Sequence, residues 1–189
     1  MSHSELLLSI ALGIGLAAAV GFRVFLPLLI VSVASYTGHL HLSPEMSWLG
    51  TGSAIATFGI AAVIEIVAYY VPGVDNALDA ITTPMALFAG TVVTAAVLTD
   101  LPPLVKWSTA IIAGGGAAGL TQSATALVRA KSTAFTGGLG NSVVASGEIA
   151  SATVFSLLAV FAPIVALILV VLFCWFVVRL ARRIFVARS

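Results

Sequence analysis

Charged residues are scarce in this chain of 189 residues, since Asp, Glu, Lys and Arg together make up only 8%. Soluble domains carry about 25% charged residues, and a water-exposed surface cannot be built from so few. The composition therefore excludes a soluble globular enzyme. It also excludes an intrinsically disordered protein, because disorder needs low hydrophobicity and 60% of these residues are hydrophobic.

Three further scarcities narrow the function classes. The formal net charge is only +1, which gives no electrostatic basis for binding nucleic acid. The single cysteine, Cys174, cannot form an internal disulfide. The catalytic patterns Gly-x-Ser-x-Gly, His-Glu-x-x-His and Cys-x-x-Cys are missing, so no motif supports an enzyme. We expect no enzymatic activity, no cofactor and no metal site.

What the sequence does contain is a series of long apolar runs. A membrane-spanning helix needs about 20 mostly apolar residues to cross a hydrocarbon core of about 30 Å. Such runs cover 6–36, 46–71, 80–99, 107–128 and 149–178. Arg23 and Glu65 are the only charged residues inside them. The predicted fold class is all-α, a polytopic transmembrane helical bundle that forms a single integral membrane domain over residues 1–189.

The last run allows two interpretations. One helix of that length would extend about 45 Å at about 1.5 Å per residue, well beyond the hydrocarbon core. The alternative is a hairpin at Pro163 between two helices, 143–162 and 164–182. The hairpin is favoured because it puts Arg129, Lys131 and the terminal arginines together in the cytoplasm. We therefore predict six spans with both chain ends in the cytoplasm, and five spans as the alternative. These terminal arginines are Arg179, Arg182, Arg183 and Arg188.

Two pairs of similar segments indicate an internal repeat. Residues 15–20 resemble 115–120, and residues 60–72 resemble 151–163, each of the latter two ending at a proline. Three spans in each half would invert one half relative to the other, which is a common plan among transporters. We predict two inverted three-helix repeats, about 5–99 and about 106–182.

Arg23 lies deep in the first apolar run, where a charge costs about 3 kcal/mol or more. Glycines before it and Pro27 after it weaken the helix, so the first helix is predicted to break here. A broken helix exposes backbone N–H groups at the start of its second half, where an anion is favoured. Arg23 is therefore a candidate binding residue for an anionic group. The alternatives are a buried ion pair or an arginine that snorkels to one interface.

Glu65 is the second costly charge, because a carboxylate in an apolar span must be paired or protonated. It is a candidate counter-ion of Arg23 and also a candidate proton carrier. The two roles are compatible, since an ion pair that breaks on substrate binding serves both.

Asp75 and Asp79 follow Pro72 and Gly73 in a polar turn. Their spacing of four residues puts them on one helix face if the turn continues as a helix. Two carboxylates with nearby carbonyl groups can hold a cation. The alternative is a solvated loop whose side chains cap a helix.

The most polar stretch covers residues 129–141, which combine glycines, hydroxyls and cationic side chains. A glycine-rich turn of this kind can cradle a phosphate or a carboxylate. The order Gly-Lys-Ser/Thr of a P-loop is missing. The alternative is a flexible cytoplasmic loop that anchors anionic lipid headgroups. The candidate binding residues are Arg129, Lys131, Thr136 and Asn141, with Glu148 just beyond.

Three segments together resemble the signatures of one family. They are GLAAAVGFRVFLPLL at 15–29, VPGVDNALD at 71–79 and TGGLGN at 136–141. In order and spacing they resemble an uncharacterised group of small bacterial integral membrane proteins, domain of unknown function (DUF) family 4126. The resemblance covers nearly the whole chain. It implies a multi-pass protein of the bacterial inner (plasma) membrane, and it brings no activity with it.

The leading hypothesis is a small transporter or channel-like protein for a small anion or a lipid phosphate. In it, Arg23 meets the anionic group, Glu65 acts as counter-ion or proton carrier, and the stretch 129–141 gates the site. The competing hypothesis is a non-transporting scaffold or assembly protein whose buried charges fix helix packing. The expected partners are membrane lipids and a small anion, with a homo-oligomer as an option and no nucleic acid.

Overall fold

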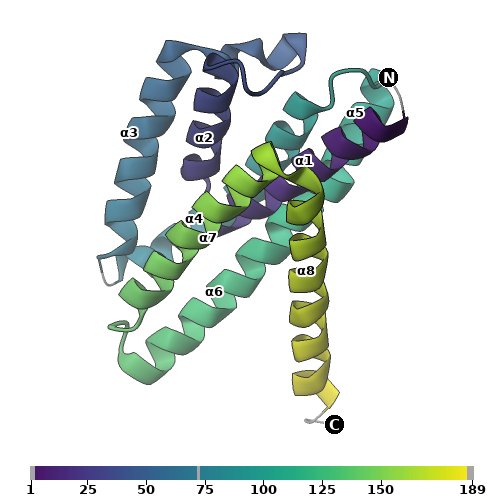
Figure 1. The fold of residues 1–189 in the computed structure, drawn as a ribbon. Helices are drawn as coiled ribbons and strands as arrows, with labels where there is room; N and C mark the ends of the chain where they lie inside the picture. The colour runs from purple at the N-terminus through teal and green to yellow at the C-terminus, as the bar shows by residue number, and fades with distance from the viewer. Residues whose placement is uncertain (1–2, 72, 187–189) are drawn as a thin grey trace.

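The computed structural model describes residues 3–71 and 73–186, and these residues form helices and turns without any strand. Pro72 and Arg188 lie outside the described residues. Figure 1 shows the helices α1 (His3–Phe22), α2 (Phe25–Tyr36), α3 (Gly52–Tyr69), α4 (Val74–Val97), α5 (Pro103–Thr109), α6 (Gly116–Thr136), α7 (Asn141–Phe161) and α8 (Pro163–Val186). A 3₁₀ turn, η1 (Pro44–Gly50), precedes α3, and a π-helical turn, η2 (Ala110–Gly115), joins α5 to α6. The predicted all-α helical bundle is confirmed.

Five stretches of the described chain are long and apolar enough to cross a membrane, which makes this a multi-span membrane protein. They are His3–Phe22, Gly52–Tyr69, Ala77–Val97, Pro103–Thr136 and Asn141–Phe161, and two shorter apolar helices are Phe25–Tyr36 and Pro163–Arg179. The last apolar run does not form one long helix, because α7 ends at Phe161 and α8 begins at Pro163. Figure 1 shows α8 turning back along the bundle, as the predicted hairpin requires.

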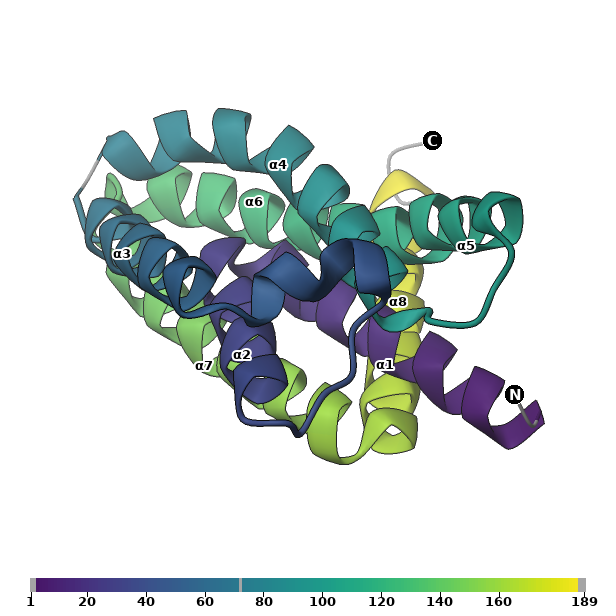
Figure 2. The ribbon, with the colours of Figure 1, turned by 90° about the horizontal axis from the view of Figure 1, so that it is seen from above.

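Helix α1 forms the core of the bundle. Its residues from Gly15 to Gly21 are all buried. Figure 2 shows α1 between α4 and α6 on one side and α7 on the other, and α8 also contacts it. Small residues permit this close approach, as is usual where helices pack in a membrane. A Cβ atom on Gly21 would lie 2.4 Å from the carbonyl oxygen of Ala118 in α6, so only glycine fits there.

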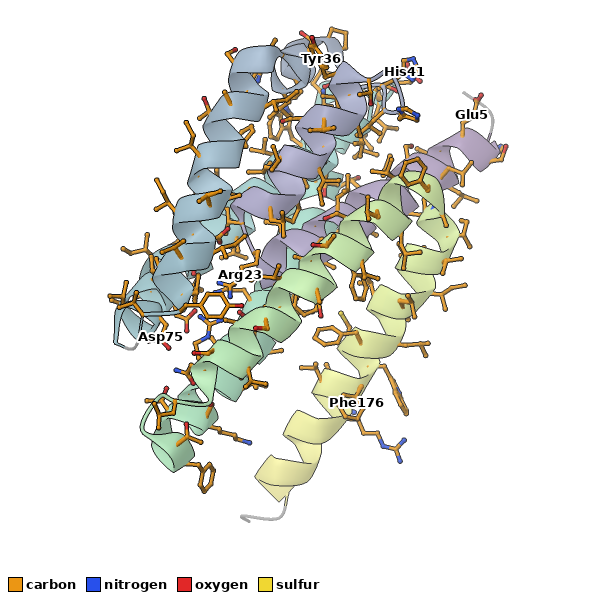
Figure 3. All side chains as sticks on the ribbon, turned by 60° about the vertical axis from the view of Figure 1, so that its left-hand side comes forward. Glu5, Arg23, Tyr36, His41, Asp75 and Phe176 are labelled. Atoms are coloured by element: carbon orange, nitrogen blue, oxygen red, sulfur yellow. The ribbon has the colours of Figure 1, made fainter. Side chains whose placement is uncertain are left out.

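The first apolar run breaks at Arg23 and Val24, which confirms the predicted broken helix. Helix α2 then runs back toward the end of the bundle at which α1 starts (Figure 1). Figure 3 shows Glu5, Tyr36 and His41 at this end, which we call the upper end, and Asp75 toward the opposite, lower end.

The ends of the chain differ from the prediction because α1 and α2 do not cross the bundle as one helix. Helix α1 begins at the upper end, whereas α8 ends at the lower end (Figure 1). The prediction of two chain ends on one side is therefore wrong. Its source is the turn at Arg23, which divides the run predicted as one span into two helices of opposite direction, α1 and α2.

The predicted internal repeat has mixed support from the helix directions. Helices α3 and α7, which carry one pair of similar segments, run in opposite directions, as inversion requires (Figure 1). Helices α1 and α6, which carry most of the other pair, both run from the upper end to the lower end. The two inverted repeats with bounds at about 5–99 and about 106–182 stay a prediction.

The close contact of α1 with α6 predicts that Gly21→Ala destabilises the protein by about 1–3 kcal/mol, since the added methyl group overpacks the contact. The control is Gly147→Ala, because a Cβ on Gly147 of α7 meets nothing within 4 Å. The thermal midpoint of detergent-purified protein, followed by loss of its size-exclusion peak, measures both. Equal midpoints for Gly21→Ala and the unmodified protein would contradict the packing described here.

Candidate functional site

Polar side chains gather below the break between α1 and α2. Figure 3 shows Arg23, at the break, between the middle of the bundle and its lower end. Helices α3, α4, α6 and α7 all contribute polar side chains that meet around it. Apart from Asp79, which is partly exposed, all the members of this polar cluster are buried. We define the polar cluster as Arg23, Glu65, Tyr69, Asp75, Asp79, Thr82, Gln122, Arg129, Asn141 and Glu148.

Two arginines share the carboxylate of Glu148. The Nη2 atom of Arg23 lies 2.9 Å from Oε2 of Glu148, and Nη2 of Arg129 donates to the same oxygen. Arg129 also pairs with Asp79, at 3.0 Å between Nη1 and Oδ1. These arginines are only 1% and 2% exposed. Glu148 therefore holds together two positive charges that would otherwise repel each other in a medium of low dielectric constant.

Tyr69 connects the arginines to an uncharged part of the cluster. The guanidinium carbons of Arg23 and Arg129 lie 3.7 and 4.1 Å from the centre of its ring, so both make cation–π contacts. Its hydroxyl donates to Asp79 at 3.1 Å and lies 2.9 Å from the Oγ1 atom of Thr82. Gln122 donates to the same Oγ1 atom at 3.2 Å.

Tyr69 and Gln122 are not among the candidate residues that the sequence identifies. The signal for Tyr69 is its position four residues after Glu65, which puts both on one face of α3. The signal for Gln122 is that it has the largest polar side chain in the uncharged run 107–128.

Glu65 binds backbone rather than the arginine. Its Oε1 accepts from the N–H of Val24 at 2.9 Å, and its Oε2 accepts from the N–H of Phe25 at 3.0 Å. A carboxylate thus lies at the N-terminal end of α2, where the dipole of the helix favours an anion, and it is the side chain of Glu65 from α3. Arg23 makes its ion pair with Glu148, so the prediction that Glu65 is the direct counter-ion of Arg23 is wrong.

Asp75 and Asp79 both face the cluster but bind different partners. Asn141 donates from Nδ2 to Oδ2 of Asp75, and also to Thr133 at 2.8 Å. The N–H of Gly73 donates to Oδ1 of Asp75 at 2.9 Å, so this carboxylate joins the start of α4 to the start of α7. Among the described residues no group of three or more His, Cys, Asp or Glu side chains could hold a metal ion.

Lys131 and Thr136 lie outside the cluster, on the exposed surface of the lower end. The hydroxyl of Thr136 donates to the carbonyl of Ser132 at 2.7 Å and accepts from the N–H of Gly140 at 2.9 Å. The predicted loop 129–141 is wrong, because α6 continues as far as Thr136. Only a short turn follows, and the positive φ of 63° at Gly137 starts it.

The cluster leaves hydrogen-bonding capacity unused. Within the described part of the chain, Nε and Nη1 of Arg23, Nε of Arg129, Oε1 of Glu148 and Oδ1 of Asn141 have no partner. Each buried polar group without a partner costs about 1–3 kcal/mol. A network that served packing alone would be expected to be better satisfied.

The family described as Domain of unknown function (DUF4126) matches residues 10–183. The chain belongs to this family. The matched segment of this DUF4126 protein contains every member of the polar cluster, and the description of the family assigns no activity. No curated protein and no solved structure matches the chain.

The shared carboxylate predicts that Glu148→Gln destabilises this DUF4126 protein by about 3–5 kcal/mol, because two buried arginines lose a common partner. Asp100→Asn is the control, since Asp100 is exposed at the upper end and its removal is worth at most about 1 kcal/mol. Thermal midpoints in detergent give the comparison. A loss for Glu148→Gln no larger than that for the control would show that the shared contact has no structural weight.

Proposed function

We propose that this protein is a small transporter or channel-like protein of the bacterial inner (plasma) membrane, with the polar cluster as its substrate site. The substrate is a small anion or the phosphate of a lipid headgroup. The observation that supports this is the pair of buried arginines with unused N–H donors beside a broken helix. Broken helices with polar groups at the break are the usual construction of transporter sites.

We infer which end of the bundle faces the cytoplasm from the positions of the exposed cationic side chains. Lys131, Arg179 and Arg182 are exposed toward the lower end, whereas Lys106 lies on α5 toward the upper end. By the excess of positive charge in cytoplasmic segments, the lower end and the end of α8 face the cytoplasm. The polar cluster is then closer to the cytoplasmic surface than to the opposite one. The path by which a substrate reaches the cluster is therefore shorter from the cytoplasm.

Transport requires that the closed cluster opens. Helices α2 and α3 pack against each other, and α2 also packs against α7. Tyr69 of α3 connects this pair to the two arginines and to Asp79. We infer that the α2–α3 pair moves relative to the remaining helices, with turns at Arg23 and at Gly73 as its hinges. The movement needs no catalytic step and no cofactor.

Membrane lipids are the expected partners of the outer surface. Large apolar side chains such as Ile64 of α3 and Phe176 of α8 are 63% and 58% exposed, which suits contact with acyl chains. Assembly into a homo-oligomer would cover part of the same surface.

The second candidate function is a membrane scaffold. The ion pairs and hydrogen bonds of the cluster join α3, α4, α6 and α7 to the break before α2. Such contacts fix the register and partners of helices, which is the best-attested role of buried polar groups. A scaffold has no need of a path from water to the cluster, whereas a transporter must have one.

Thiol labelling in membranes tests for this path. On a Cys174→Ser background, Thr82→Cys places a thiol inside the cluster, since Thr82 is 4% exposed. A reagent that cannot cross the membrane is expected to modify it from the side of the lower end. If the open state has a population of about 0.1–10%, the reaction is about 10 to 1,000 times slower than at an exposed thiol.

Two control variants complete the labelling experiment. Lys131→Cys, which is exposed, must react at full rate, and Ser32→Cys, which is 0% exposed in α2, must not react. Transport is contradicted if Lys131→Cys reacts while Thr82→Cys is as inert as Ser32→Cys from both sides. The scaffold would then be the better explanation of the cluster.

A further inference from the structure

We propose that the start of α2 is the binding site for a small carboxylate, which displaces Glu65 while Glu65 takes up one proton. This inference rests on the proposed transport function, and it adds the substrate class and the coupling ion. It predicts that the anion and the proton move together.

The geometry of Glu65 shows what this site binds. Both of its oxygens accept hydrogen bonds, one from each of two consecutive backbone N–H groups, at 2.9 and 3.0 Å. Helix α2 is 12 residues long, so its start carries a partial positive charge. Glu65 belongs to another helix, and Val24 at the start of α2 provides no side-chain cap of its own. A free carboxylate can therefore make the same two contacts once Glu65 has moved away.

Arg23 provides the second and independent observation. Its side chain is fully buried, and its Nε and Nη1 atoms have no partner among the described residues. The guanidinium carbon of Arg23 lies 3.7 Å from the centre of the Tyr69 ring. Glu65 lies one turn before Tyr69 on the same face of α3. Arg23 directly precedes Val24. Its guanidinium contacts the Tyr69 ring one turn from Glu65, which puts its unused donors in the same part of the cluster as this site.

The charges of the cluster explain why a proton accompanies the anion. The cluster already contains four carboxylates, Glu65, Asp75, Asp79 and Glu148, against two guanidinium groups. A further negative charge in this buried site would be strongly unfavourable. When the displaced Glu65 takes up a proton from the solvent, the total charge of the cluster with its bound anion is the same as before. The anion itself binds without any covalent bond being formed or broken.

A carboxylate fits this exchange better than a phosphate dianion. It replaces one carboxylate by another with the same charge and the same two acceptor oxygens. A phosphate dianion would need a second proton to leave the charge of the cluster unchanged. Glu65 is, on this view, a tethered equivalent of the substrate that keeps the site occupied between transport cycles.

Isothermal titration of the full chain in lipid nanodiscs tests the proposal, with sodium acetate as the probe. Titrations in two buffers of different ionisation enthalpy give the number of protons taken up with each acetate. We expect one proton for each acetate bound. The affinity should fall about tenfold for each pH unit above the titration of Glu65, as linkage to one proton requires. Sodium chloride and inorganic phosphate serve as comparison anions.

Two variants separate Glu65 from the remainder of the cluster. Glu65→Gln keeps the shape of the side chain but has no charge, so acetate should bind without proton uptake and without the dependence on pH. Arg23→Gln should lose acetate binding, and Asp100→Asn should behave as the unmodified protein does. The proton count of the unmodified protein tests the proposal even if Glu65→Gln does not fold.

The inference is overturned if acetate binds the unmodified protein without proton uptake, or if Glu65→Gln retains the full uptake. It is also overturned if phosphate binds and acetate does not. If the thiol at position 82 is labelled in that case, the transport proposal is still supported, but its substrate is not a carboxylate. Failure of both acetate and phosphate to bind, together with an inert thiol at position 82, removes the transport proposal as well.

Discussion

The shared carboxylate of Glu148 is the contact on which the lower half of the bundle depends. A single oxygen accepts from Arg23 at the helix break and from Arg129 of α6, while the two guanidiniums meet the same tyrosine ring. Without this oxygen two positive charges would be buried side by side in a medium where their repulsion is large. The break between α1 and α2, the end of α3 and the positions of α6 and α7 are therefore mutually dependent.

Close packing makes that contact geometrically possible. Gly21 is two residues before Arg23, and it lets α1 approach the backbone of α6 at Ala118. Arg129 follows about three turns later on the same helix, so the approach of α1 to α6 brings Arg129 and Arg23 close enough to share Glu148 of α7. The glycine contact joins α1 to α6 by shape, and Glu148 of α7 links Arg23, just after α1, to Arg129 of α6 by charge.

The members of the site are largely predictable from the sequence, because burying charge in an apolar chain is expensive. This reasoning identifies Arg23 and Glu65. Glu148 is instead found beside the polar stretch 129–141, and the break at Arg23 is found from the glycines before it and Pro27 after it. The partners are not predictable in the same way. Glu65 meets the backbone of α2 because α2 folds back against α3, and no local pattern specifies that return.

Helical phase explains the remaining differences. If the stretch 129–141 is predicted to be a loop, each of its polar side chains is an equally good candidate binding residue. As a helix it directs Arg129 and Thr133 to one face, because they are four residues apart, and Lys131 to another. Tyr69 and Gln122 escape detection for the opposite reason. Uncharged polar groups cost little to place in an apolar span, so their presence is a weak sign of function.

The continuous helix Pro103–Thr136 has a consequence for the response of the protein to its bilayer. With 34 residues it extends about 51 Å, against a hydrocarbon core of about 30 Å. Such a helix must tilt, or protrude into the headgroup region, and the balance between the two shifts with the thickness of the membrane. Arg129 lies on this helix, so lipids with longer or shorter acyl chains act directly on the position of a buried charge.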